Sequence, residues 1–123
     1  MLAEETAALI AEYYDSWKGG GDSFDAERLR RVLAADLDFE GPIAGKRRGA
    51  EGFVAGLGRF AESLKGLVML EEVRQGDQAA FLYDCDLGAG TLRFAEFIRV
   101  GDGKIEAVKL LYDADRYRAL GAR

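Results

Sequence analysis

Four segments in the second half of the chain alternate apolar with polar residues, and short glycine-containing turns separate them. We predict strands over residues 67–74, 79–87, 91–100 and 104–112. The turns between them are Gly76-Asp77, Gly88-Ala89-Gly90 and Gly101-Asp102-Gly103, and these residue types accept the positive φ that tight hairpins require. Strands joined by tight hairpins pair antiparallel. The pattern therefore predicts an antiparallel meander.

The start of the chain has helical periodicity instead. Apolar residues recur at three- and four-residue spacings over residues 2–17, and Gly19-Gly20-Gly21 ends that predicted helix. A second helix is predicted from a cap at Asp22 or Ser23 to about Ala35.

A short strand and a third helix lead into the meander. The strand is predicted over residues 37–43, where Gly41-Pro42 ends it, and a turn is expected at Gly45-Lys46. The third helix, over residues 50–64, has one apolar face made by Phe53, Leu57, Phe60 and Leu64. Its glycines, each costing about 1 kcal/mol relative to alanine, indicate close packing or a pocket wall; they are Gly52, Gly56 and Gly58.

A run of helices followed by a run of strands is typical of the α+β class. The chain has 123 residues, 49% of them hydrophobic, which suits one core and leaves no room for a second domain. We expect a single domain over residues 1–123, with three N-terminal helices on one face of a curved antiparallel sheet. A short closing helix is expected within residues 113–123, with Tyr117 and Leu120 facing inward.

Composition excludes several classes of function. The net charge of −5 disfavours binding to a phosphate backbone, so no nucleic-acid partner is expected. No apolar run approaches the roughly 20 residues of a membrane helix, and the N-terminus lacks the basic start of a signal peptide. Cys85 is the only cysteine, which excludes an intrachain disulfide. We expect a cytoplasmic protein without a membrane partner.

The sequence contains no histidine, and this absence limits its chemistry. Triads and metal sites that depend on histidine are excluded, so acid–base chemistry would fall to Asp, Glu, Tyr, Lys or Cys85. We interpret Cys85 as a buried, inert thiol rather than a nucleophile, because it lies on the apolar face of its predicted strand.

Two charged clusters resemble binding motifs. Asp36, Asp38 and Glu40 match the start of a calcium-binding loop, but Arg47 stands where that motif requires a bidentate glutamate. Lys46-Arg47-Arg48 could contact an anion, although charges before a helix are more often simply solvated. We expect no metal site and no cofactor.

Three segments carry a resemblance that covers nearly the whole chain. They are Glu12-Tyr13-Tyr14-Asp15-Ser16-Trp17 before the glycine run, Phe39-Glu40-Gly41-Pro42 on the first strand, and residues 96–105 near the end. Together with the order of elements, these segments resemble the nuclear transport factor 2-like superfamily, which includes SnoaL-like and ketosteroid isomerase-like proteins. The resemblance implies a cone, in which helices close a strongly bent sheet over a deep, mostly apolar pocket.

One strand face is expected to point into the cone. Its members are almost all apolar, whereas their neighbours are polar; they are Phe81, Tyr83, Cys85, Leu87, Phe94, Glu96, Ile98, Val100, Val108, Leu110 and Tyr112. Glu96 is the exception. A carboxyl group among apolar residues needs a hydrogen-bond partner or stays protonated, and its pKa would then be raised. Tyr13, Tyr14 and Trp17 are the candidate partners for a purely structural Glu96.

The resemblance also implies catalytic residues. Ketosteroid isomerases stabilise an oxyanion with a tyrosine and a protonated aspartic acid, and use a second aspartate as base. By motif, the tyrosine falls on Tyr13, with Tyr14 as the alternative, and the protonated acid falls on or next to Glu96. Gly41 occupies the position of the base. Glu40 projects to the opposite face unless the strand bulges, and Asp38 is expected on the face of Gly41.

Two functions remain open at this stage. One is isomerase-like proton transfer on a small hydrophobic molecule, with Tyr13 and neutral Glu96 as oxyanion hole and Asp38 or Glu40 as base. The other is a non-catalytic ligand-binding or dimerisation module of the same fold. In either case the expected ligand-binding residues are Tyr14, Trp17, Phe39, Phe53, Leu57, Phe60, Phe81, Tyr83, Ile98, Leu110 and Tyr112.

The outer face of the sheet is expected to form a homodimer. Phe97 and Leu111 alternate with the inward residues and would be exposed in a monomer.

Overall fold

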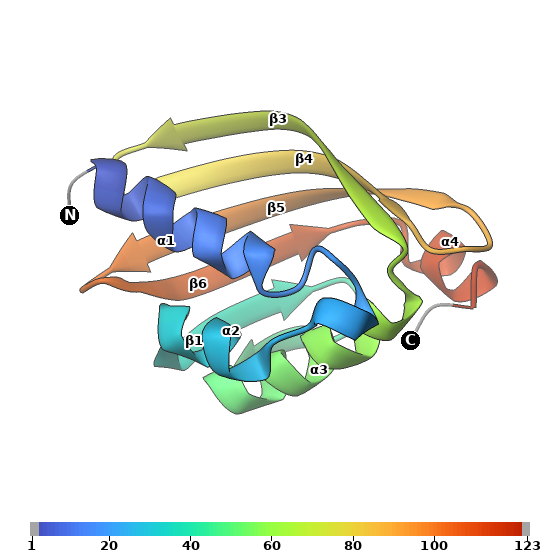
Figure 1. Cartoon of the computed structure of the whole chain (residues 1–123), viewed down its shortest axis with the longest axis horizontal. Helices are drawn as coiled ribbons and strands as arrows, with labels where there is room; N and C mark the ends of the chain where they lie inside the picture. Colours follow the sequence, from blue (N-terminus) through green and yellow to red (C-terminus); the bar gives the residue numbers. More distant parts are fainter. Residues whose placement is uncertain (1–2, 122–123) are drawn as a thin grey trace.

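The computed structural model describes residues 3–121, which form four α-helices, one 3₁₀ turn and a single sheet (Figure 1). The elements in chain order are α1 (Ala3–Asp15), η1 (Gly21–Ser23), α2 (Ala26–Val32), β1 (Leu33–Gly41), β2 (Gly45–Arg48), α3 (Ala50–Ser63), β3 (Gly66–Gln75), β4 (Gln78–Asp86), β5 (Thr91–Gly101), β6 (Lys104–Leu111) and α4 (Ala114–Ala119). The α+β class predicted from the sequence is confirmed. No helix in residues 3–121 is long and apolar enough to cross a membrane.

The sheet has six strands in the order β2-β1-β6-β5-β4-β3. Strands β3 to β6 form the predicted antiparallel meander. The prediction that the whole sheet is antiparallel was wrong, because β1 pairs parallel to β6, with Phe39 opposite Val108. This pairing places the first strand of the chain beside the last one, and the sheet is mixed.

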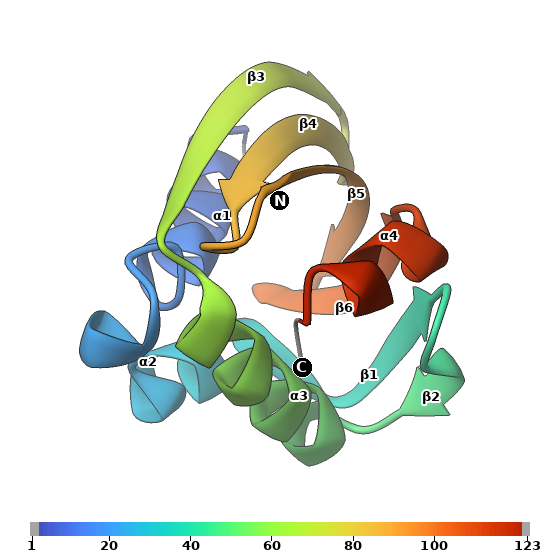
Figure 2. The ribbon, with the colours of Figure 1, turned by 90° about the vertical axis from the view of Figure 1, so that its right-hand side faces the viewer.

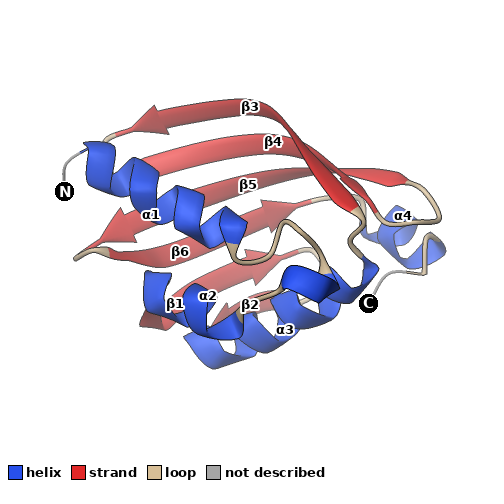
Figure 3. Ribbon diagram, viewed as in Figure 1, coloured by secondary structure: helices blue, strands red, loops and turns tan. Residues whose placement is uncertain are grey.

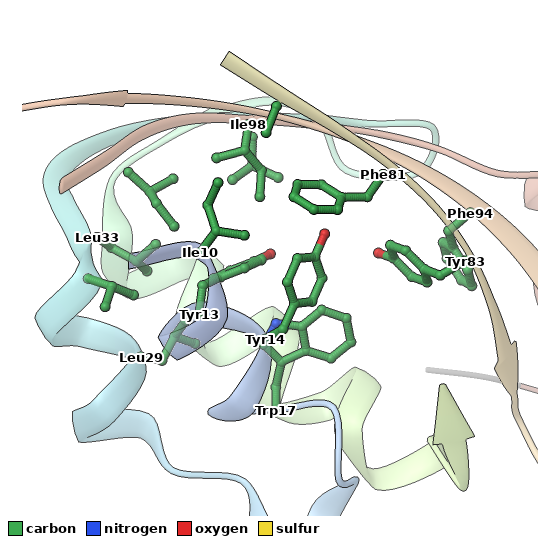
Figure 4. Packing of buried hydrophobic residues seen from close by; sticks show 14 of the residues in the cluster. Ile10, Tyr13, Tyr14, Trp17, Leu29, Leu33, Phe81, Tyr83, Phe94 and Ile98 are labelled. Atoms are coloured by element: carbon green, nitrogen blue, oxygen red, sulfur yellow. The ribbon is translucent and has the colours of Figure 1, made fainter. Parts of the chain in front are cut away.

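All the helices lie toward the concave side of the curved sheet (Figure 3). Helix α1 lies over the sheet, whereas α2 and α3 lie against β1, the strand next to the edge strand β2. The predicted inward positions from Phe81 to Val108 are buried, whereas Leu110 and Tyr112 are half-buried. The core between α1 and the sheet includes Tyr13, Trp17, Phe81 and Phe94. Figure 4 shows how the aromatic rings of α1 meet those of β4 and β5.

The second helix differs from its prediction at both ends. Its cap is Asp25 rather than Asp22 or Ser23, because the Asp25 carboxylate accepts a hydrogen bond from the Arg28 amide and the preceding residues form η1. It ends at Val32 rather than near Ala35, since the chain then extends into β1 and pairs with β6. The first strand therefore begins four residues before the predicted start.

A short hairpin replaces the turn predicted at Gly45-Lys46. Gly45 has a φ of 70° and begins β2, which pairs antiparallel with β1. All four residues of β2 are exposed, and none of them is a large apolar residue. The segment therefore lacks the alternation of apolar and polar residues by which strands are recognised in a sequence. This hairpin brings three basic side chains, of Lys46, Arg47 and Arg48, to the edge of the sheet.

Candidate functional site

Three tyrosine hydroxyl groups converge on the Glu96 carboxyl group. Tyr13 donates to Oε2 at 2.6 Å, while Tyr14 and Tyr83 donate to Oε1 at 2.8 and 2.7 Å. The hydroxyls come from α1 and β4 and point toward one place, as Figure 4 shows. Only 2% of Glu96 is exposed. The inward orientation predicted for Glu96 is confirmed, and of the candidate partners Tyr13 and Tyr14 contact it, with Tyr83 as a third.

Burial controls the ionisation of this cluster. Removal from water raises the pKa of Glu96, and the hydrogen bonds from the three tyrosines offset part of that rise. Burial and the nearby Glu96 carboxylate hold the pKa of each tyrosine above its usual range. The tyrosines therefore stay protonated, and Glu96 is the group in the cluster that gains or loses a proton most readily.

Counting protons shows what the cluster can offer a ligand. With Glu96 ionised, the three hydroxyl protons fill the three contacts, and no donor is left over. With Glu96 protonated, the same three contacts leave one O–H in excess. The protonated cluster can therefore donate a hydrogen bond to a ligand oxygen, whereas the ionised cluster can accept a proton.

The cluster lies on the wall of a cavity of about 630 Å³ between α1, α3 and the sheet. Most of the lining is aromatic or aliphatic, with charged groups at a few positions. The lining residues are Tyr13, Trp17, Phe39, Ile43, Ala44, Arg47, Arg48, Gly49, Gly52, Phe53, Gly56, Leu57, Arg59, Phe60, Tyr83, Phe94, Glu96, Val108, Leu110, Tyr112 and Tyr117. We call this space the inner cavity.

Helix α3 forms one wall of the inner cavity. Its predicted apolar face, Phe53, Leu57 and Phe60, is only partly buried because it borders this space. Of the three glycines, Gly52 and Gly56 border the cavity, whereas Gly58 packs closely, since an added Cβ there would lie 3.2 Å from the Phe24 ring.

Many of the predicted site residues meet at this cavity. Those that line it are Tyr13, Trp17, Phe39, Phe53, Leu57, Phe60, Tyr83, Glu96, Leu110 and Tyr112. Tyr14, Phe81 and Ile98 are buried but are absent from the lining. Tyr14 therefore holds the Glu96 carboxyl group from behind, whereas Tyr13 and Tyr83 contact both Glu96 and the open space.

Asp38 and Glu40 lie on the other side of the sheet. The pairing of β1 with β6 places Phe39 on the inner face with Val108, so Asp38 and Glu40 share the outer face with Ala107 and Lys109. The expectation that Asp38 shares the face of Gly41 was wrong, because alternation places residues three apart on opposite faces. Strand β1 is regular here, without the bulge that Glu40 would need to reach the cavity.

Sequence reasoning missed some of the residues at the site. The hydrogen bond between Tyr83 and Glu96 was not predicted, although both residues were assigned to the inner face. Phe94 had the same alternation signal and was left out of the ligand-binding set. Arg47 and Arg59 line the cavity from β2 and α3, and only the basic cluster at residues 46–48 pointed toward either of them.

These features define a class of small α+β proteins in which helices close a curved sheet over an apolar pocket. The model of the SnoaL-like domain family matches residues 10–108. The chain therefore belongs to the SnoaL-like family within the NTF2-like superfamily, as the sequence resemblance predicted. No curated protein matches the chain.

Solved structures share the fold at low sequence identity. A Kribbella flavida DSM 17836 protein described as a candidate ketosteroid isomerase has a TM-score of 0.75 at 23% identity, over 89% of this chain and 78% of its own. A candidate SnoaL-like polyketide cyclase from Jannaschia sp. CCS1 has a TM-score of 0.76 at 13% identity, over 95% and 91%. TerC co-crystallised with polyporic acid has a TM-score of 0.72 at 20% identity, over 94% and 97%. The likeness establishes the fold.

Proposed function

We propose that the inner cavity binds a small, mostly apolar molecule that carries a carbonyl or phenolic oxygen. The observation that supports this most directly is a buried carboxyl group, held by three tyrosines, on the wall of an otherwise apolar cavity. Small-molecule sites commonly combine apolar walls with a few converging polar groups. The protonated cluster has one O–H group in excess, on Glu96, Tyr13 or Tyr83. The ligand oxygen would accept a hydrogen bond from this group.

The same arrangement supports oxyanion stabilisation during proton transfer. Donors fixed in place before a reaction stabilise the charge that develops on an enolate oxygen, and a site shielded from water strengthens this effect. Tyr13 and neutral Glu96 match the tyrosine and acid of the isomerase arrangement, and a structure described as a candidate ketosteroid isomerase shares the fold. We propose isomerase-like proton transfer as the reaction this site is suited to assist.

One observation favours the second candidate function, ligand binding without a reaction. Glu96 is the only carboxylate among the described residues that line the inner cavity. Asp38 and Glu40, the bases considered from the sequence, lie on the outer face. When neutral Glu96 serves as the oxyanion donor, the described lining offers no carboxylate base, so water or a group of the ligand would have to accept the proton.

Phenol binding tests the proposed donor group, because a phenolate imitates the charge of an enolate. We expect 2-naphthol to bind, and Tyr13→Phe and Glu96→Gln each to weaken binding by about 10-fold, since each alters a donor at the cavity wall. Tyr14→Phe is the matched control, because Tyr14 contacts Glu96 without lining the cavity. Its effect should be smaller. Fluorescence titration with thermal unfolding of each variant measures both affinity and folding.

Absence of naphthol binding, with the variants merely less stable, would mean that the cluster is structural and would overturn the binding proposal. To separate reaction from binding, α-hydrogen exchange of a bound cyclic ketone can be followed by NMR in D₂O. Exchange that Glu96→Gln abolishes would support proton transfer. Binding without exchange would leave the non-catalytic function.

We further propose that the protein forms a homodimer through the outer face of the sheet. Phe97, Leu111 and Val73 are 45%, 57% and 65% exposed, and Phe97 and Val73 border a hollow of about 760 Å³ on this face. Charged side chains of both signs surround it, including Glu40, Lys46 and Lys109. A surface with an apolar centre and mixed charges can complement a second copy of itself across a twofold axis.

Phe97→Asp is expected to raise the dimer dissociation constant by about 30-fold or more, because it places two carboxylates near the centre of a symmetric interface. Sedimentation at micromolar concentrations measures the change. Ala55→Asp, on the exposed side of α3, is the control and should leave the dimer intact. A wild-type protein that sediments as a monomer would contradict the proposal.

A further inference from the structure

The acidic and basic side chains that line the inner cavity lie in different places. Glu96 is buried, whereas the arginines that line the cavity, Arg47, Arg48 and Arg59, are exposed. They come from β2 and α3, which lie with α4 around one end of the curved sheet (Figure 2). The opening of the cavity is therefore positive, although the net charge of the chain is −5.

The side chain of Arg59 lies along α3. A Cβ at Gly56 would lie 3.8 Å from Nη2 of Arg59, so the guanidinium group lies back over Gly56, one turn toward the start of the helix. The positive charge of Arg59 also lowers the pKa of Tyr117, against the burial that raises it to about 12. Arg59 and Tyr117 therefore lie close together at the cavity.

Arg47 lies in the edge hairpin, where it borders both the inner cavity and the hollow on the outer face of the sheet. It pairs with Phe39, an inner-face residue, and its Nε donates to the Ala44 carbonyl oxygen at 3.0 Å. Arg48 is different, because it pairs with Asp38 and its Nε lies 3.5 Å from the Asp38 carboxylate. Within residues 3–121, no carboxylate forms an ion pair with Arg47 or Arg59.

We infer that the ligand of the inner cavity is an amphipathic anion whose carboxylate, or a similar acidic group, lies at the opening beside Arg47 and Arg59. This inference rests on the proposed binding function and narrows its ligand class. The apolar body would lie along Phe53, Leu57 and Phe60, with an oxygen at the Glu96 cluster. A guanidinium without a carboxylate partner in the protein is well suited to bind the carboxylate of a ligand.

Three probes of similar shape measure how much the carboxylate of the ligand contributes to binding. They are 6-hydroxy-2-naphthoic acid, its methyl ester and 2-naphthol, titrated at pH 7.5, where only the first carries a carboxylate. We expect the acid to bind about 5- to 10-fold more tightly than the ester at low ionic strength, and this advantage to shrink as salt is added. Exposed charge pairs contribute little free energy to binding, so the inference does not require the acid to bind more than about 10-fold more tightly than the ester.

Three variants complete the experiment. Arg47→Gln and Arg59→Gln should each lower the affinity for the acid by about 2- to 3-fold, and the double variant should bind acid and ester equally. Affinity for the ester should change less than affinity for the acid in each of them. Arg31→Gln, at an exposed arginine of α2 that is not part of the cavity lining, is the matched control.

The outcomes separate this inference from the proposed function. Equal binding of acid and ester by the wild type, or an advantage that persists in the double variant, would overturn the anionic ligand and leave the binding function standing. Failure of all three probes to bind would overturn the binding function and the anionic ligand together.

Discussion

Glu96→Ala should lower the free energy of unfolding by about 3 kcal/mol, because it removes the acceptor of three buried hydroxyl groups. The three hydroxyls are not equivalent. Tyr13 and Tyr83 line the cavity and can bind water in the variant, whereas Tyr14 lies behind Glu96 and cannot. The loss should therefore be concentrated at Tyr14. Urea unfolding followed by circular dichroism measures the change.

Glu96→Gln separates hydrogen bonding from charge and remains informative if the alanine variant does not fold. The pKa of Glu96 is raised in the folded state above its ordinary value of 4.5, so the folded protein holds this proton more tightly than the unfolded chain does. The stability from this group is complete below pH 4.5 and declines as the pH rises through the folded pKa. Glutamine lacks this decline.

The glutamine substitution should therefore cost less stability at pH 8 than at pH 4. A cost that is independent of pH would show that Glu96 has the same pKa in the folded and unfolded states. A loss below 1 kcal/mol in the alanine variant would show that water replaces the carboxyl group at all three tyrosines.

The parts of the fold that the sequence predicts are those in which local pattern and burial agree. The meander over β3 to β6 was predicted because alternation and hairpin glycines coincide, and Gly76, Gly88 and Gly103 indeed have positive φ. Strand β2 could not be predicted in this way, because its residues Gly45–Arg48 are exposed on both faces and give no periodic signal. The parallel pairing of β1 with β6 is a contact between distant segments that no local pattern encodes.

The residues of the candidate site that could be predicted are likewise those with a local sequence pattern. Glu96 could be identified from the sequence because a lone carboxyl group among inward apolar residues needs partners, and Tyr13 and Tyr14 supply two of them. Its third partner, Tyr83, faces inward by alternation, but only the cross-sheet geometry brings its hydroxyl to Glu96. Asp38 was assigned to the wrong face of the sheet, because it lies three residues before Gly41 and alternation places such residues on opposite faces. Arg59 could not be placed from the sequence, because only the structure shows that its side chain lies back over Gly56.

Gly56→Phe should abolish ligand binding while leaving the fold intact. Gly56 lies three residues after Phe53 and four before Phe60, on the helix face that borders the cavity. An added Cβ would meet only the Arg59 guanidinium at 3.8 Å, so the backbone accepts a side chain here. A phenyl ring would fill the space that the ligand needs, and we expect at least about a 30-fold loss of 2-naphthol affinity.

Two matched variants make the result interpretable. Gly56→Ala should stabilise α3 by up to about 1 kcal/mol, because alanine is the better helix former, and should leave naphthol room to bind. Ala55→Phe adds the same ring on the exposed side of the same helix and should change affinity little. Unchanged binding by a folded Gly56→Phe variant would place the ligand outside the inner cavity, most simply in the hollow on the outer face of the sheet. In that case the Glu96 cluster would have a structural role, holding α1 on the sheet through Tyr13 and Tyr14.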